Sequence, residues 1–223
     1  MLLVSDFDGT LNRGGVSEKD AAAVRLWQDA GHKFVIATGR GTEFAPTAAH
    51  DLPFVPDAMI GCNGALFFDR EGRLTRSFTL PGETEVKLSA LAGEYGCLSC
   101  HPARDGIDAD RFCTLTVYFP DIAQAKAYAA RVQRDVPGLT CYQYSTIVTV
   151  VGADTTKATG VARLAEAWGV EPTQIRTVGD SFNDFAMLEQ YRGFAIRGSE
   201  LGAFYARIAP DVAWVCARLL SKA

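Results

Sequence analysis

The sequence predicts an α/β fold with a doubly wound parallel sheet as its core and a small inserted α+β unit. Apolar runs typical of buried strands alternate with helical segments at the start and end of the chain. This alternation breaks near residue 80 and resumes near residue 152. Polar residues follow directly after several strands. Because ligands bind beyond the carboxyl ends of strands in open α/β sheets, those residues are the first site candidates.

The first stretch, residues 1–80, reads as strand, helix and strand. Residues 1–4 are an apolar strand, and Ser17 can cap a helix over 17–30 that Gly31 ends. Residues 33–38 form a second buried strand, which implies a right-handed parallel crossover. A weaker helix over 42–50 and a strand over 58–62 follow, then an Asn63-Gly64 turn and a hairpin formed by 65–68 and 73–79.

The middle stretch has a different pattern and is predicted to be a separate domain. It reads as a helix over 83–95, a polar loop, a strand over 112–119, a helix over 121–136, and strands over 139–142 and 146–151. We therefore expect a separate inserted domain at 81–151 and a core domain made of 1–80 and 152–223.

The α/β pattern resumes in the last stretch. A helix over 157–168 ends at Gly169, and a short strand over 175–178 leads into a polar motif. Residues 194–196 are predicted as one more strand and 212–220 as a closing helix.

Composition and charge narrow the function classes. The 223 residues are 48% hydrophobic and 22% charged, typical of a soluble globular protein, and the formal charge is −4. That charge disfavours binding to a nucleic-acid backbone, and no run is long enough to cross a bilayer. Since the first residues lack a signal-peptide pattern, we expect a cytoplasmic protein. Its oligomeric state is expected to be a monomer or a homodimer.

The six cysteines are scattered and are expected to be reduced thiols in a cytoplasmic chain. Cys97, Cys100 and His101 match a C-x-x-C-H haem-attachment pattern, but that pattern belongs with export. A zinc site would need further ligands, such as Cys113 or Cys141. We therefore expect unliganded thiols.

Charged and hydroxyl side chains stand at four strand ends or helix starts. Asp6 and Asp8 follow the first strand, Thr38 the second, and Asp180 the strand over 175–178, with Asp184 close behind; Lys157 begins a helix. Carboxylates that converge repel one another unless a cation is bound, and carboxylate oxygens suit Mg²⁺. A metal, a lysine and a hydroxyl together could stabilise a transferred phosphoryl group.

At these positions the chain resembles a known family. DFDGT at 6–10, ATGR at 37–40, Lys157 and GDSFND at 179–184 are similar to the four ordered motifs of the haloacid dehalogenase superfamily of phosphohydrolases. The turn at 63–65 and a cap inserted between the second and third motifs resemble the Cof-type sugar-phosphatase branch. FAIRGS at 194–199 and the short tail depart from that branch. The resemblance covers the whole chain and implies a Rossmann-like core.

The resemblance also implies a role for each motif residue. Asp6 would be the nucleophile and Asp8 the acid and base. Thr38 and Lys157 would complete the catalytic set and bind the phosphoryl group. Further phosphate or substrate contacts would come from Gly39, Arg40, Asn63 and Asn183. The Mg²⁺ ligands would be Asp6, the backbone carbonyl of Asp8, Asp180 and Asp184.

The predicted function is a Mg²⁺-dependent phosphatase acting on a small phosphorylated metabolite, either a sugar phosphate or a phosphoglycerate- or phosphoglycolate-type ester. Two alternatives remain at this point: a phosphomutase of the same superfamily, and a phospho-accepting signalling module resembling a receiver domain. The polar loop of the cap offers four candidate substrate contacts: His101, Arg104, Asp105 and Arg111. Their other interpretation, an exposed polar loop, is equally open.

Overall fold

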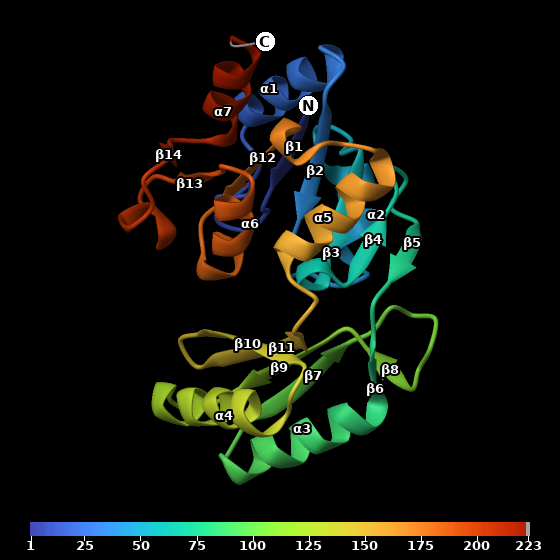
Figure 1. The fold of residues 1–223 in the computed structure, drawn as a ribbon, viewed down its shortest axis with the longest axis vertical. Helices are drawn as coiled ribbons and strands as arrows, with labels where there is room; N and C mark the ends of the chain where they lie inside the picture. Colours follow the sequence, from blue (N-terminus) through green and yellow to red (C-terminus); the bar gives the residue numbers. More distant parts are fainter. Residues whose placement is uncertain (222–223) are drawn as a thin grey trace.

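An eight-stranded sheet forms the larger part of the molecule in our computed structural model, which describes residues 1–221 (Figure 1). The strands lie in the order β14-β13-β12-β1-β2-β3-β4-β5. In that order their bounds are Ile208–Ala209, Phe194–Ile196, Ile175–Gly179, Leu2–Ser5, Lys33–Ala37, Ala58–Gly61, Leu66–Phe68 and Leu74–Ser77. The six strands from β14 to β3 are parallel, and β4 and β5 extend the sheet antiparallel. The predicted α/β class is confirmed.

Helices cover both faces of this sheet. One face carries α1 (Glu18–Asp29), α2 (Phe44–Asp51) and α7 (Val212–Leu220), and the other carries α5 (Lys157–Trp168) and α6 (Phe185–Gln190). Successive strand residues point to opposite faces, so Leu3 packs with α1 whereas Leu2 and Val4 pack with α5. Apolar runs such as LLV therefore bury every residue, as expected for a strand covered on both sides.

A second, four-stranded antiparallel sheet is formed by the stretch between residues 80 and 152. Its strand order is β10-β11-β9-β7, and α3 and α4 cover the face that points away from the larger sheet (Figure 1). The bounds are Leu139–Tyr144 for β10, Ile147–Gly152 for β11, Thr114–Tyr118 for β9, Ser99–Ala103 for β7, Gly82–Glu94 for α3 and Ile122–Asp135 for α4. A separate two-stranded antiparallel sheet pairs β6 (Leu80–Pro81) with β8 (Arg111–Phe112). The uncovered face of this sheet points towards the larger sheet.

The prediction of a polar loop after α3 is wrong in part, because this segment contains strand β7. The segment reads SCHPA, with small residues and a proline that argue against a strand. β7 is an edge strand, where proline is tolerated because one side of the ladder needs no partner. The short strand β14 was also not predicted. Within residues 1–221, no helix has the length and apolar character needed to cross a bilayer.

Candidate active site

Polar side chains gather at the carboxyl edge of four adjacent parallel strands. Asp180 follows β12, Asp6 follows β1, Thr38 follows β2, and Asn63 follows β3. The strand order β12-β1-β2-β3 makes these four ends neighbours, although the residues are far apart in the sequence. The position is the one at which open α/β sheets bind their ligands.

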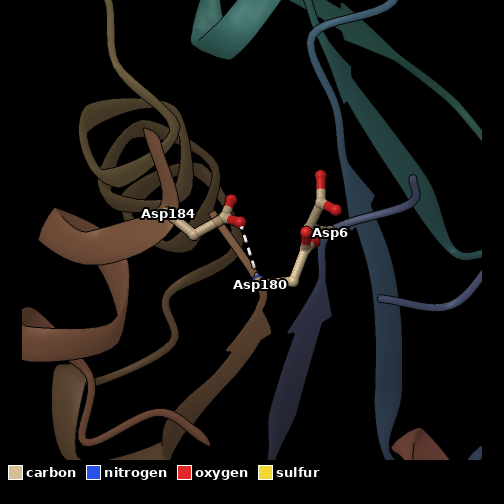
Figure 2. A group of neighbouring side chains, drawn as sticks. All are labelled: Asp6, Asp180 and Asp184. Carbon is tan, nitrogen blue, oxygen red and sulfur yellow. Dashed lines mark hydrogen bonds between the residues drawn. The ribbon is translucent and has the colours of Figure 1, made fainter. Parts of the chain in front are cut away.

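Three carboxylates converge at this edge (Figure 2). One ligand oxygen each from Asp6, Asp180 and Asp184 lies within 4.8 Å of the others. Asp184 ends a short 3₁₀ turn, Phe182–Asp184, and its Oδ2 accepts hydrogen bonds from the backbone N–H groups of Asp180 at 3.0 Å and Ser181 at 3.2 Å. The local turn therefore fixes the Asp184 carboxylate beside Asp180.

Lys157 joins two of these carboxylates. Its Nζ donates to Asp6 Oδ1 at 2.5 Å and to Asp184 Oδ1 at 2.7 Å, and all three side chains are buried. The lysine is the first residue of α5, whose N-terminus is fixed by a capping box between Thr156 and Thr159. That start sits against Gly64, where an added Cβ would lie 2.2 Å from the Thr156 carbonyl oxygen at a φ of +110°. The Asn-Gly turn thus lets α5 bring Lys157 to the carboxylates.

The site carries more negative than positive charge. Burial is the largest effect and raises the pKa of Asp6 well above its ordinary value; Lys157 opposes this effect, whereas Asp184 and Asp180 reinforce it. Burial alone would lower the pKa of Lys157, but Asp184 and Asp6 more than offset that effect and raise it. One lysine therefore faces three carboxylates, and a further positive charge would stabilise the group.

The donor set fits a hard divalent cation. Asp6 Oδ2 is buried and accepts no hydrogen bond within residues 1–221. Asp180 is held by a hydrogen bond from Thr10 Oγ1 to its Oδ1 at 2.6 Å. Gly9 has a φ of +85°, and an added Cβ would lie 2.3 Å from Asp180 Oδ2, so a side chain at position 9 would block this carboxylate. An unpartnered buried carboxylate oxygen beside a second, oriented carboxylate is what a cation site requires.

Asp8 has a different environment from Asp6. Its side chain is 49% exposed, against 5% for Asp6. Arg40 binds it through two bonds, Nε to Oδ2 and Nη2 to Oδ1, both 2.7 Å. The guanidinium carbon of Arg40 also lies 5.0 Å from the ring centroids of Phe7 and Phe44. The arginine predicted as a phosphate contact is thus engaged with Asp8.

The remaining motif residues line the same edge. Thr38 is buried, and its Oγ1 accepts a hydrogen bond from the Arg40 N–H at 3.2 Å. The Asn63 N–H donates to the Thr38 carbonyl at 3.0 Å, and an added Cβ on Gly39 would lie 3.4 Å from Asn63 Oδ1. Asn183 Nδ2 donates to Asn63 Oδ1 at 3.1 Å. The structure therefore brings the predicted residues of the four motifs and the Asn63 turn to one region.

Two hollows open beside these residues, between the two sheets. One, about 350 Å³, is lined by Asn63 and the segment 181–183 on one side and by 141–144 of β10 on the other. The second, about 600 Å³, is lined by residues including Asp8, Asp180, Arg13 and Arg197 and is bordered by Tyr144. We call the two together the interlobe cleft. The sequence analysis did not predict that Thr10, Ser181 and Arg197 lie at this site. For Arg197 the one indication was that the segment FAIRGS at 194–199 departs from the family pattern.

The four candidates from the predicted polar loop do not line the interlobe cleft. Arg104 pairs with Glu85 at 2.6 Å, and Asp105 accepts a hydrogen bond from Ser77 at 2.8 Å. Arg111 binds Thr79 Oγ1 at 2.6 Å. His101 lies on edge strand β7 and hydrogen-bonds Ser99. Asp105 and Arg111 instead tie the small sheet to β5 and to the segment that follows it, whereas Arg104 binds α3 beside the small sheet.

All six cysteines are free thiols. Cys97 Sγ and Cys100 Sγ lie 3.9 Å apart. Among residues 1–221, no cysteine joins a group of three metal-ligating side chains.

Comparison with known families gives a match over nearly the whole chain. The family of haloacid dehalogenase-like hydrolases matches residues 3–106 and 102–200. A phosphoglycolate phosphatase from Methanoculleus marisnigri is 27% identical over 210 residues, covering 88% of this chain and 84% of that protein. One from Pyrobaculum aerophilum is 30% identical over 203 residues, covering 87% and 82%.

Solved structures share the fold. A phosphatase of the haloalkanoate enzyme superfamily from Bacteroides thetaiotaomicron superposes with a TM-score of 0.82 at 22% identity, covering 99% of this chain and 94% of that one. A sugar phosphatase of subclass IIB in the same superfamily superposes with a TM-score of 0.77 at 18% identity, covering 99% and 98%. At these identities the likeness is one of fold.

Proposed function

Because the chain belongs to the haloacid dehalogenase-like hydrolases and its curated relatives are phosphatases, we propose that it is a Mg²⁺-dependent phosphatase of a small phosphorylated metabolite. The observation that carries this proposal is Lys157 held between Asp6 and Asp184, beside Asp180. The buried ammonium group of Lys157, beside clustered carboxylates, suits a site that must receive a negatively charged phosphoryl group.

Asp6 is the proposed nucleophile. One of its oxygens attacks phosphorus, the bond to the leaving oxygen breaks, and an aspartyl phosphate forms on Asp6. Lys157 keeps Asp6 oriented and offsets the negative charge that the phosphoryl group brings. Thr38, with its hydroxyl at the next strand end, and the backbone beside it donate to the phosphoryl oxygens.

Asp8 is the proposed acid and base. Asp8 must first be protonated, which replaces one of its two bonds from Arg40; it then gives that proton to the leaving oxygen and takes one from the water that attacks phosphorus and frees Asp6. Its exposed position suits both transfers, because the leaving group and the water must reach it. Arg40 holds the carboxylate through two bonds and so positions it, which refines the expected direct contact of Arg40 with phosphate.

The proposed metal ligands are the free oxygen of Asp6, the Asp8 backbone carbonyl and Asp180. Both oxygens of Asp184 already accept hydrogen bonds, so this residue is better suited to orient Lys157 and the Asp180 backbone. When bound, Mg²⁺ would neutralise charge on the phosphoryl oxygens. Mg²⁺ is proposed over softer metals because every donor is oxygen.

We propose that residues 81–151 act as a cap over the interlobe cleft. The sheet of this segment presents Tyr142 and Tyr144 of β10 to the cleft, opposite Asn63 and Asn183. Closure of such a segment would exclude water and select the substrate.

Among substrate classes, a small phosphorylated acid is favoured over a neutral sugar phosphate. Asp8 lines the larger hollow of the cleft, so the leaving group extends there, towards Arg13 and Arg197. Arg13 is paired with Asp20, whereas Arg197 forms no ion pair within residues 1–221. A free guanidinium beside the leaving group suits a carboxylate. The curated relatives named phosphoglycolate phosphatase agree with this class.

The alternatives have less support. A receiver-like module needs neither the second carboxylate Asp8 nor a covering sheet, and no observation favours a phosphomutase. Cytoplasmic location, oligomeric state and the absence of nucleic-acid or membrane binding remain predictions from the sequence.

The test is a phosphate-release screen with Mg²⁺ across phosphorylated acids and sugars, ranked by kcat/KM, with a chelator control. We expect release that needs Mg²⁺ and is fastest for a phosphorylated acid. Transfer of the phosphoryl group to a sugar hydroxyl without phosphate release would instead establish a mutase.

A further inference from the structure

Four arginines line a hollow of about 610 Å³ that is separate from the interlobe cleft. They are Arg176 of β12, Arg192 after α6, Arg207 before β14 and Arg218 of α7. Phe194, Ile208, Trp214 and Leu219 complete its walls. We call it the arginine hollow. It lies at the amino ends of the last three strands of the large sheet, whereas the catalytic carboxylates lie at the carboxyl ends.

The arginine hollow carries more positive than negative charge. Within residues 1–221 none of the four guanidinium groups forms an ion pair, and the nearby Glu189 carboxylate acts on Tyr205, the phenol that Arg207 binds. Burial lowers the pKa of Arg176, and the charges of Arg192 and Arg207 lower it further. In a chain of net charge −4, such a concentration of like charge is stabilised by an anion.

Arg192 stands in a backbone conformation that favours glycine. Its φ is +50°, and it directly follows Tyr191, the C-cap of α6, at the position where helices commonly place a glycine. The neighbouring glycine, Gly193, serves another purpose, because an added Cβ there would lie 2.2 Å from Thr177 Oγ1. A strained arginine at a site that tolerates glycine indicates that its side chain is used.

Neutral groups hold the other guanidiniums in place. Arg207 Nε donates to the Gly193 carbonyl at 3.1 Å and its Nη2 to Tyr205 Oη at 3.0 Å. Arg176 Nη1 donates to the Thr173 carbonyl at 3.0 Å. The guanidinium carbon of Arg218 lies 5.1 Å from the Trp214 ring centroid. Since each guanidinium has five N–H donors, several remain for a ligand.

We propose that the arginine hollow binds a small polyanion with two or more phosphoryl groups. Guanidinium groups pair with phosphate oxygens through two parallel bonds, and four of them call for several negative charges. The volume is in the range of small-ligand pockets rather than that of a nucleic-acid groove. This site does not depend on the proposed phosphatase activity, because it shares no residue with the interlobe cleft.

The test is calorimetric titration of the full chain with inorganic tripolyphosphate, in low salt with a chelator to remove divalent metals. We expect saturable binding to one site per chain. Arg192→Gly should weaken it about tenfold or more, as expected when charge-assisted hydrogen bonds are lost. This variant also relieves the strained backbone, so its melting temperature should stay equal or rise, and weaker binding would not reflect unfolding.

Two controls separate the arginine hollow from other sites. Arg134→Gln, on the exposed face of α4, makes the same change in charge and should leave the affinity unchanged. Thr38→Ala, at the catalytic edge, should also leave it unchanged. Binding that is lost in Thr38→Ala but kept in Arg192→Gly would overturn the proposal, as would absent or unsaturable binding. Tighter, Arg192-dependent binding of a single-stranded RNA oligonucleotide would overturn it in favour of nucleic acid.

Discussion

Lys157 Nζ lies 2.5 Å from Asp6 Oδ1, an ion pair between residues 151 positions apart that is buried on both sides. The same Nζ holds Asp184 at 2.7 Å. Removing the lysine would leave two buried carboxylates without a cation, a situation that is strongly destabilising.

Lys157→Met should therefore lower the free energy of unfolding by about 3–5 kcal/mol in a metal-free buffer. Mg²⁺ should recover part of this loss, because a second cation can replace some of the missing charge. Urea denaturation of wild type and variant, each with Mg²⁺ and with a chelator, measures both effects. A variant as stable as wild type without metal would mean that the pair contributes nothing to folding.

Asp6→Asn should keep the fold and lose catalysis. The amide is nearly isosteric but a poor nucleophile, so kcat should fall by at least about a thousandfold. Circular dichroism checks the fold, and phosphate release checks turnover. Residual activity above that level would argue against Asp6 as the nucleophile.

Asp180→Ala should raise the Mg²⁺ concentration for half-maximal activity by about tenfold or more, because it removes a proposed ligand. Thr10→Val removes only the hydrogen bond that orients Asp180 and should have a smaller effect in the same direction. An Asp180→Ala enzyme with an unchanged Mg²⁺ titration would exclude this carboxylate from the metal site.

Arg197→Gln should raise KM for a phosphorylated acid by about tenfold while leaving KM for a neutral sugar phosphate unchanged, since one charge-assisted pair is lost. Arg197→Lys should recover part of the affinity, and Arg134→Gln serves as the matched control. Equal changes in KM for both substrates would show that Arg197 does not recognise a carboxylate.

The ionised Asp57 carboxylate should contribute to the free energy of unfolding, and this contribution should disappear at low pH. Burial raises the pKa of this carboxyl, but hydrogen bonds from Gln28, the Phe34 N–H and Lys33 more than offset it, so the net pKa lies below 3.8. The contribution is therefore present above pH 3.8 and is lost as the pH falls through the lower, folded value. The stability gap between wild type and Asp57→Asn should shrink on acidification, which denaturant titrations at several pH values can follow. A gap independent of pH would contradict this.

Much of the fold was predictable because its cause is local. The helix cap at Ser17, the Asn63-Gly64 turn and the apolar strands were all placed correctly. The gathering of Asp6, Thr38 and Asp180 was also predictable, because adjacent parallel strands present their carboxyl ends on one edge.

Other features depend on tertiary packing and leave no local pattern. Edge strand β7 contains Pro102, which argues against a strand when read alone. The bidentate pair of Arg40 with Asp8 joins two motifs whose mutual distance no spacing reveals. The small sheet contributes β10 to the cleft, not the charged loop that carries Arg104, because the fold of the small sheet decides which of its strands faces the larger sheet.

The central claim is that Asp6 carries the phosphoryl group, and trapping that intermediate tests it most directly. Excess enzyme is mixed with substrate and Mg²⁺, quenched in acid within the first turnover, digested and analysed by mass spectrometry. We predict a phosphoryl group on the peptide that contains Asp6, and none on that peptide in Asp6→Asn. A phosphoryl group on another residue, or complete turnover with no phosphorylated peptide at any quench time, would contradict the account.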